Sequence, residues 1–330
     1  MQRKMLWKTA WICALLAAIL SSCGPATASN PPQAGQAGGP AAIRPAALAG
    51  GEKLRVVATT AILGDVVRNV GGDAIDLTVL IGPGQDPHAY EPTPRDVAAM
   101  EKAQVVFENG LGLEAGLDST IRAAASHGQP VVEVSAGARI LGNDTAAPAA
   151  GAHDATGNPH VWFDPANVGV WLHNIETTLS ALDPRNAAAY RANAASYALK
   201  LTDLDVYIQA QVAKIPVERR KLVTDHEALE YFAARYGFTI VGTVIPSYST
   251  IAEPSAANMT DLINKIRAEK VPAVFVGTTA NAKVAEVVAH ETAAKVLPLY
   301  SESLGAPGSG ADTYLGMMRT DIDRIEKGLS

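Results

Sequence analysis

Four polar segments of this 330-residue chain carry side chains that could bind a metal ion. Each lies in a loop that follows a short run of apolar or β-branched residues, as expected where a β-strand ends. The segments are Asp86-Pro-His88, Asn158-Pro-His160, Asp225-His226 and Ser301-Glu302-Ser303. Three imidazoles and one carboxylate supply the four ligands of a closed tetrahedral site for a transition metal. The candidate metal ligands are therefore His88, His160, His226 and Glu302.

The other histidines serve as controls, because a single histidine in a loop is usually only a solvated side chain. His127 ends a predicted helix, His173 lies within one and His290 is near the end of another. We expect these three to be structural. His153 lies in a long loop and could capture a metal ion loosely.

The elements that must position these ligands alternate between strand and helix from Lys53 onward. Strands are predicted in the first half at 54–59, 77–81, 104–107 and 130–134, and in the second half at 221–224, 239–244, 273–276 and 296–300. This alternation predicts an α/β fold of two β/α sandwich lobes, each with a mostly parallel four-stranded sheet. Open parallel sheets bind ligands beyond the carboxyl ends of their strands, where the four polar segments fall, two from each half.

A long helix is predicted from Asp183 to Pro216, between the two halves. Asp183 can cap its first turn, Pro184 suits the first helical position, and Pro216 ends it. Apolar residues recur at a spacing of three and four, at Tyr190, Tyr197, Leu201, Leu204, Ile208, Val212 and Ile215. An ordinary amphipathic surface helix is the alternative, but a length of about 45 Å favours a rigid connection between the lobes.

The N-terminus has the pattern of a bacterial export signal. Three basic residues precede an apolar run at 11–20, which is too short to span a bilayer comfortably, so residues 1–22 are predicted to be a signal peptide. Leu20-Ser-Ser-Cys23 resembles a lipobox, in which Cys23 becomes the lipidated first residue of the mature protein. The alternative is that Cys23 is simply part of a cleaved signal. Residues 24–51 are rich in Ala, Pro, Gly and Gln and are predicted to be a flexible tether. The lobes are then 52–182 and 217–330, with 183–216 as the linking helix.

The charge balance narrows the choice of partner. Removal of the signal takes away three positive charges and moves the formal net charge from −6 to about −9. An acidic chain is a poor partner for nucleic acid or anionic lipid, and it suits the binding of a cation. The only cysteines are Cys13, within the signal, and Cys23, so no disulfide framework is expected.

Several segments together resemble the signatures of the bacterial zinc/manganese ABC-transporter substrate-binding proteins, a family that includes lipoproteins once called adhesins. They are DPHAYEPTP, NGLGLE, NPHVWFDP, HEALEYFAARYG, EPSAANMTDLINKI and PLYSESLG, in the family's order over residues 52–330. The resemblance implies two β/α lobes joined by one long helix, with the metal held between them.

The resemblance also implies His88, His160, His226 and Glu302 as the metal ligands. Histidine at the third position favours Zn²⁺ over Mn²⁺, since glutamate there is more typical of manganese binders. Glu302 stands where the family usually has aspartate, and Asp312 is the substitute ligand if Glu302 cannot reach.

The function implied is that of a monomeric, extracytoplasmic solute-binding component of an ABC importer. It would capture Zn²⁺, or else Mn²⁺, as transported ligand and deliver it to a membrane permease driven by its ATPase. Its lipid anchor would hold it at the outer face of the cytoplasmic membrane, at the cell surface or in the periplasm. Four protein ligands leave no open position for an activated water, so we expect no enzymatic activity.

Two alternatives remain from the sequence. A metallohydrolase could use the same ligands, although His226-Glu-Ala-Leu-Glu230 has glutamate where the zinc-protease motif HExxH requires its second histidine. A surface adhesin lipoprotein could instead carry the metal as a structural ion.

Overall fold

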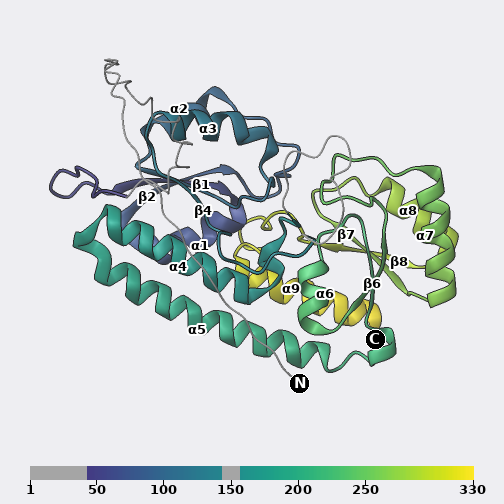
Figure 1. Ribbon diagram of the computed structural model, residues 1–330. Helices are drawn as coiled ribbons and strands as arrows, with labels where there is room; N and C mark the ends of the chain where they lie inside the picture. Colours follow the sequence, from purple (N-terminus) through teal and green to yellow (C-terminus); the bar gives the residue numbers. More distant parts are fainter. Residues whose placement is uncertain (1–42, 143–156) are drawn as a thin grey trace, which may run out of the picture. The chain divides into compact units, whose positions relative to one another are not determined.

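The computed structural model describes residues 43–142 and 157–330 (Figure 1). The predicted signal peptide, Cys23 and His153 lie outside the described residues. The first half contains the strands and helices β1 (Leu54–Thr60), α1 (Ala61–Gly71), β2 (Ile75–Ile81), α2 (Pro94–Lys102), β3 (Val105–Glu108), α3 (Asp118–Ser126), β4 (Val131–Glu133) and α4 (Pro165–Leu182). The second half contains β5 (Lys221–Thr224), α6 (Glu230–Tyr236), β6 (Thr239–Thr243), α7 (Ala256–Glu269), β7 (Ala273–Gly277), α8 (Lys283–Thr292), β8 (Lys295–Leu299) and α9 (Tyr314–Leu329).

Each half builds one parallel four-stranded sheet, with the orders β2-β1-β3-β4 and β6-β5-β7-β8. In β1, Val56 packs into a core cluster with α1 and α4, whereas the next residue, Val57, packs with α2 and α3. The second sheet repeats this arrangement, because Leu222 shares a cluster with α6 and α9 and Val223 shares one with α7 and α8. Both sheets are therefore buried on both faces, as the apolar runs of their strands require. The predicted fold of two β/α sandwich lobes is confirmed.

The predicted connecting helix is α5 (Ala187–Val212), and its predicted apolar stripe is buried. It packs against α1 and α4 of the first lobe and α9 of the second (Figure 1). Its ends differ from the prediction of one unbroken helix over 183–216. Pro184–Asn186 form a separate 3₁₀ turn. The Asp183 carboxylate accepts hydrogen bonds from the side chains of Asn186 and Tyr190 and caps no backbone N–H of α5. At the other end the chain tightens into i→i+3 turns before Pro216, which disfavours helix at the residue before it.

The two lobes and α5 share one continuous hydrophobic core that extends from Leu54 in β1 to Leu329 in α9. A buried polar contact reinforces it, since Asp65 of α1 accepts hydrogen bonds from Tyr314 N at 2.9 Å and from the Tyr197 hydroxyl at 3.4 Å. Tyr314 begins α9 and Tyr197 belongs to α5. Separating the lobes as rigid bodies would expose this core to water, so motion at the site has to be local.

Residues 43–51 correct the prediction of a flexible tether. Ile43, Ala46 and Leu48 pack against the core, and Ala46 N donates a hydrogen bond to Leu182 O at 2.8 Å. The small-residue composition of 24–51 hid these apolar side chains, whose burial stabilises the contact. This end of the predicted tether is part of the folded protein.

Candidate metal centre

Two of the four candidate ligands are presented by the same local structure, an Asx residue followed by proline and histidine. Asp86 Oδ1 accepts a hydrogen bond from His88 N at 2.9 Å, and Asn158 Oδ1 accepts one from His160 N at 3.0 Å. In each segment the proline restricts φ and the Asx side chain bonds the backbone two residues on, which makes a compact Asx turn. The turn fixes the backbone from which each imidazole projects.

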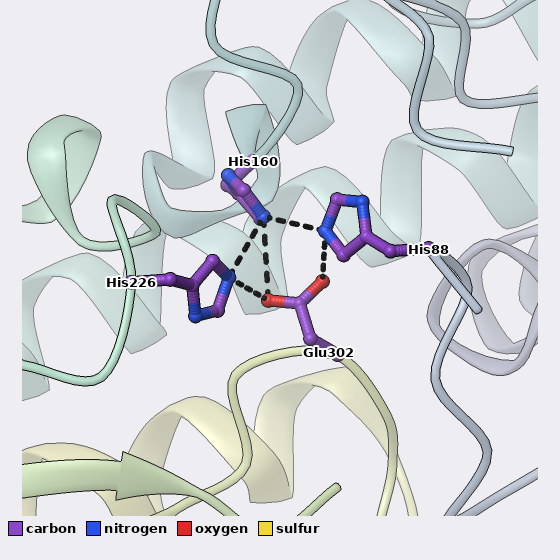
Figure 2. A group of neighbouring side chains, drawn as sticks. All are labelled: His88, His160, His226 and Glu302. Carbon is purple, nitrogen blue, oxygen red and sulfur yellow. Dashed lines mark hydrogen bonds and ion pairs between the residues drawn. The ribbon is translucent and has the colours of Figure 1, made fainter. Parts of the chain in front are cut away.

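The structure brings all four candidate ligands together (Figure 2). His160 Nε2 lies 3.2 Å from His88 Nε2 and 3.3 Å from His226 Nε2. Glu302 Oε1 lies 3.0 Å from His226 Nε2 and 3.3 Å from His160 Nε2, and Oε2 lies 3.4 Å from His88 Nε2. All four side chains are buried.

These separations fit the edges of a coordination tetrahedron. A metal–ligand distance of about 2.0–2.1 Å gives tetrahedron edges of about 3.3–3.4 Å. Five separations of 3.0–3.4 Å lie close to that value, with Oε1 of Glu302 facing His160 and His226 and Oε2 facing His88. One donor atom from each of the four residues lies within 4.8 Å of the other three, which leaves room for one cation among them.

The hydrogen bonds of the outer ring nitrogens fix the direction of the lone pairs. His160 Nδ1 lies 2.7 Å from Asn158 Oδ1, whose amide is oriented because its Nδ2 donates to Glu227 O and to Glu230 Oε2. His226 Nδ1 lies 3.1 Å from the Asp225 carboxylate. An amide oxygen and a carboxylate can only accept, so in the neutral rings Nδ1 carries the proton and Nε2 holds a lone pair. Those lone pairs point at each other and at Glu302.

The pKa values of the clustered side chains are shifted from their usual values by burial and by one another. Burial lowers the pKa of His160 to about 4, against the opposing attraction of Glu302. Burial also acts to lower the pKa of His226, but hydrogen bonds to Asp225 and Glu302 outweigh it and raise the pKa to about 10. Burial alone would raise the pKa of Glu302, yet the charge of His160 and hydrogen bonds to the three imidazoles hold it well below its usual value. The carboxylate is therefore charged, and positive charge is drawn to the cluster.

The Glu302 carboxylate shows that these residues suit a cation. It is 2 % exposed, and its oxygens face the three imidazoles, whose Nε2 atoms lie 3.0–3.4 Å away. When those imidazoles are neutral, as metal binding requires, the buried carboxylate faces no positive charge and is costly unless a cation compensates it. A divalent ion among the four donor atoms supplies that compensation.

The control histidines behave as predicted. His127, His173 and His290 are exposed on helices or at helix ends and take no part in the cluster. Asp312 is exposed, accepts a hydrogen bond from Gly308 N and also lies outside the cluster, so the structure favours Glu302 over this substitute.

The four candidate ligands follow strands that only partly correspond between the two sheets. His160 and Glu302 follow the corresponding edge strands β4 and β8. His88 follows the edge strand β2, whereas His226 follows β5, whose counterpart in the first sheet is β1. Strand order along the chain does not reveal strand order in the sheet.

An amide and a carboxylate next to the candidate ligands in sequence orient two of the imidazoles. Of the carboxylates Asp225, Asp164 and Glu91, which lie near the candidate ligands in sequence, only Asp225 contacts an imidazole. Asp164 instead caps α4 and pairs with Arg235, and Glu91 is exposed. Asn158 was missed as a partner of His160, although its position two residues before a histidine, across a proline, is a detectable Asx-turn signal.

A buried cluster of three histidines and one carboxylate, held by loops of two parallel α/β lobes, defines a metal-binding solute-binding protein. The model of the family described as "Zinc-uptake complex component A periplasmic" matches residues 56–328, and the chain belongs to this family. It is therefore a metal-binding, substrate-binding component of an ABC importer and not an enzyme, which removes the hydrolase alternative.

Individual relatives align with this chain over most of their length. The manganese-binding lipoprotein MntA of Halalkalibacterium halodurans is 34% identical over 282 residues, which cover 85% of this chain and 90% of MntA. The manganese ABC transporter substrate-binding lipoprotein PsaA of Streptococcus pneumoniae serotype 4 is 32% identical, over 85% of this chain and 90% of PsaA. Among solved structures, the periplasmic zinc-binding protein TroA from Treponema pallidum superposes with a TM-score of 0.74 at 29% identity, covering 84% of this chain and all of TroA.

Proposed function

We propose that this protein captures one divalent transition-metal ion through His88, His160, His226 and Glu302 and delivers it to a membrane permease. The observation that carries this proposal is the buried cluster of three imidazoles and one carboxylate, whose donor atoms lie within 4.8 Å of one another. The ion is cargo, so the cluster must both retain it and give it up.

Zn²⁺ is the proposed cargo, with Mn²⁺ next. Three imidazoles and one carboxylate in a four-donor arrangement suit zinc, whereas manganese prefers more oxygen ligands and higher coordination. Glu302 offers two oxygens that face different histidines, so two-oxygen coordination of a larger ion is also accessible. The relative named for manganese is 34% identical in sequence to this chain and the one named for zinc is 29% identical, so sequence identity does not choose between the two metals.

We propose that the mature protein is a monomer anchored outside the cytoplasmic membrane by a lipid on Cys23. MntA and PsaA are named as lipoproteins, which supports this location. Within 43–142 and 157–330, no helix is long and apolar enough to cross a membrane. The permease and its ATPase are the proposed partners, and 183–216 is the proposed boundary segment between lobes 52–182 and 217–330.

Metal analysis of the purified protein, followed by competition titrations of Zn²⁺ against Mn²⁺, tests this proposal. We expect one ion per chain, tighter binding of Zn²⁺, and loss of most metal-induced thermal stabilisation in His88→Ala. His290→Ala is the matched control, because the His290 side chain is 88% exposed on α8. Unchanged metal content in both His88→Ala and Glu302→Ala would contradict the assignment of the ligands.

A further inference from the structure

The loop that carries His88 is bonded to the opposite lobe through Asp86. One oxygen of this carboxylate, Oδ1, holds His88 N at 2.9 Å. The other, Oδ2, accepts a hydrogen bond from the Thr250 hydroxyl at 2.7 Å. Thr250 lies in the second lobe, in the loop that follows β6. One carboxylate therefore links the backbone of a candidate ligand to the lobe on the other side of the ion.

A second bond joins the same loop to the segment that carries Glu302. Gly84 N donates to Ser303 Oγ at 2.8 Å, and Ser303 is the residue after Glu302. Ser303 is 1 % exposed whereas Gly84 is exposed, so this contact is partly buried. The backbones beside His88 and Glu302 are thus held together without either ligand taking part in the bond.

The other half of the cluster is fastened much more strongly. The His160 segment is bound to the second lobe through Asn158, whose Nδ2 donates to Glu227 O at 2.9 Å and whose carbonyl accepts from the Tyr231 hydroxyl at 2.7 Å. Asp164, just beyond it, pairs with Arg235 of α6 at 3.0 Å. His160 and His226 therefore lie on a braced frame, and the loop that carries His88 is the more weakly attached side.

We propose that the Asp86–Thr250 and Gly84–Ser303 hydrogen bonds form a latch across the site that sets how long a bound ion stays. This inference rests on the proposed function, because it takes His88 and Glu302 as ligands. Asp86 is a positioning residue, since it acts on the ion through His88. The ion leaves when the latch opens and the loop at 82–88 withdraws His88, while His160 and His226 keep their places.

The shared core supports a local opening of this kind. A continuous hydrophobic cluster passes through both lobes and α5, so the lobes cannot part widely without exposing it. The latch bonds are only partly buried, and Gly84 is exposed. Breaking the Asp86–Thr250 bond and the bonds of Ser303 Oγ to Gly84 N and Gly82 O frees one ligand loop at far lower cost than separating the lobes.

Release kinetics of Zn²⁺ test the latch. Zinc-loaded protein is mixed with an excess of a chromophoric chelator in a stopped-flow instrument, and the release rate is compared among variants. Thr250→Val keeps the shape of the side chain and removes its hydroxyl, and we expect release about tenfold faster, because a hydrogen bond to a charged group is lost. Thr250→Ser restores the hydroxyl and should return the rate to that of the wild type. Thr260→Val is the matched control, since that exposed hydroxyl bonds only within α7, to Ala256 O.

Ser303→Ala provides a second test on the other bond, and it should also accelerate release. Each variant should still bind one Zn²⁺, and the melting temperature of the metal-free protein should change no more than in Thr260→Val. Release rates in Thr250→Val and Ser303→Ala equal to that of the control would overturn the latch. If wild-type protein binds no Zn²⁺, or if His88→Ala retains it fully, the proposed function itself fails and the latch fails with it.

Discussion

Replacing Asp225 by asparagine tests how the protein prepares one ligand for the ion. Asp225 Oδ1 accepts from both His226 Nδ1 and His226 N, and its Oδ2 accepts from Gly277 N at 2.9 Å. In Asp225→Asn one of these oxygens becomes an NH₂ group that faces a donor. If that group faces His226, the imidazole must accept at Nδ1 and carry its proton on Nε2, which blocks metal binding. If it faces Gly277, the side chain that accepts from His226 no longer carries a negative charge, and the hydrogen bond from Gly277 N is lost.

The expected size of the effect follows from either outcome. Loss of a partner that orients a metal-bound histidine costs about 10- to 100-fold in metal affinity, or about 1.4–2.7 kcal/mol. At a fixed free concentration of Zn²⁺ well above the dissociation constant, the metal-linked stability falls by the same free energy. For a chain of this size the melting temperature of the loaded protein should then drop by about 2–4 °C.

Chelator competition measures the affinity and calorimetry measures the melting temperature. Asp76→Asn is the matched control, because Asp76 is an exposed residue of the edge strand β2 in the other lobe. A dissociation constant for Asp225→Asn within twofold of both the wild type and this control would refute the idea that Asp225 prepares His226 for the ion.

Three further predictions concern the packing around Gly277, the ion pairs of Arg235 and the proton that Zn²⁺ displaces. Gly277→Ala should weaken Zn²⁺ binding in chelator competition, since its added Cβ would collide with Ser301 Oγ beside the site. Gly169→Ala is the control: it has open space on α4, so it should leave the affinity unchanged and raise the melting temperature slightly. Arg235→Ala should destabilise the metal-free protein by about 2 kcal/mol, seen as a melting temperature lower by about 3 °C, because two ion pairs are lost. An unchanged melting temperature would show that these ion pairs are dispensable. Because the pKa of His226 is raised to about 10, Zn²⁺ should displace about one proton from it at pH 8, and the apparent affinity should fall as pH falls below 10. Titration calorimetry in two buffers of different ionisation enthalpy measures this proton, and a binding enthalpy independent of buffer would count against it.

Much of the fold could be predicted from local pattern. The β-branched run predicted as a strand at 54–59 is β1 (Leu54–Thr60), and the spacing of apolar residues along 183–216 correctly gave the buried face of α5. These features depend on residues close together in sequence. Tertiary contacts are different: the backbone N–H of Glu227, just before α6, donates to Ser247 O, a partner that local sequence does not reveal.

In the candidate site, too, some features could be predicted from local sequence and others depend on tertiary contacts. The side chains of the cluster could be named in advance because histidine and glutamate at strand ends are chemically distinctive, and the family resemblance indicated which of them to choose. The partner of Asp86 could not, since Thr250 is 164 residues away and the bond depends on how the two lobes meet. Asp225 directly precedes His226, so its contact with that imidazole is local, but its second bond, to Gly277 N, is again a tertiary contact.

The distances along the chain between the ligands have a consequence for the choice of cation. His88 and His160 are 72 residues apart, and His160 and His226 are 66 apart, so no short peptide of this protein holds a chelating pair of them. A newly exported, unfolded chain has no assembled site to offer whichever metal it meets first. Selection among competing ions is thus deferred until the polypeptide has folded, when the fixed spacing of the donors, rather than order of arrival, decides which ion is kept.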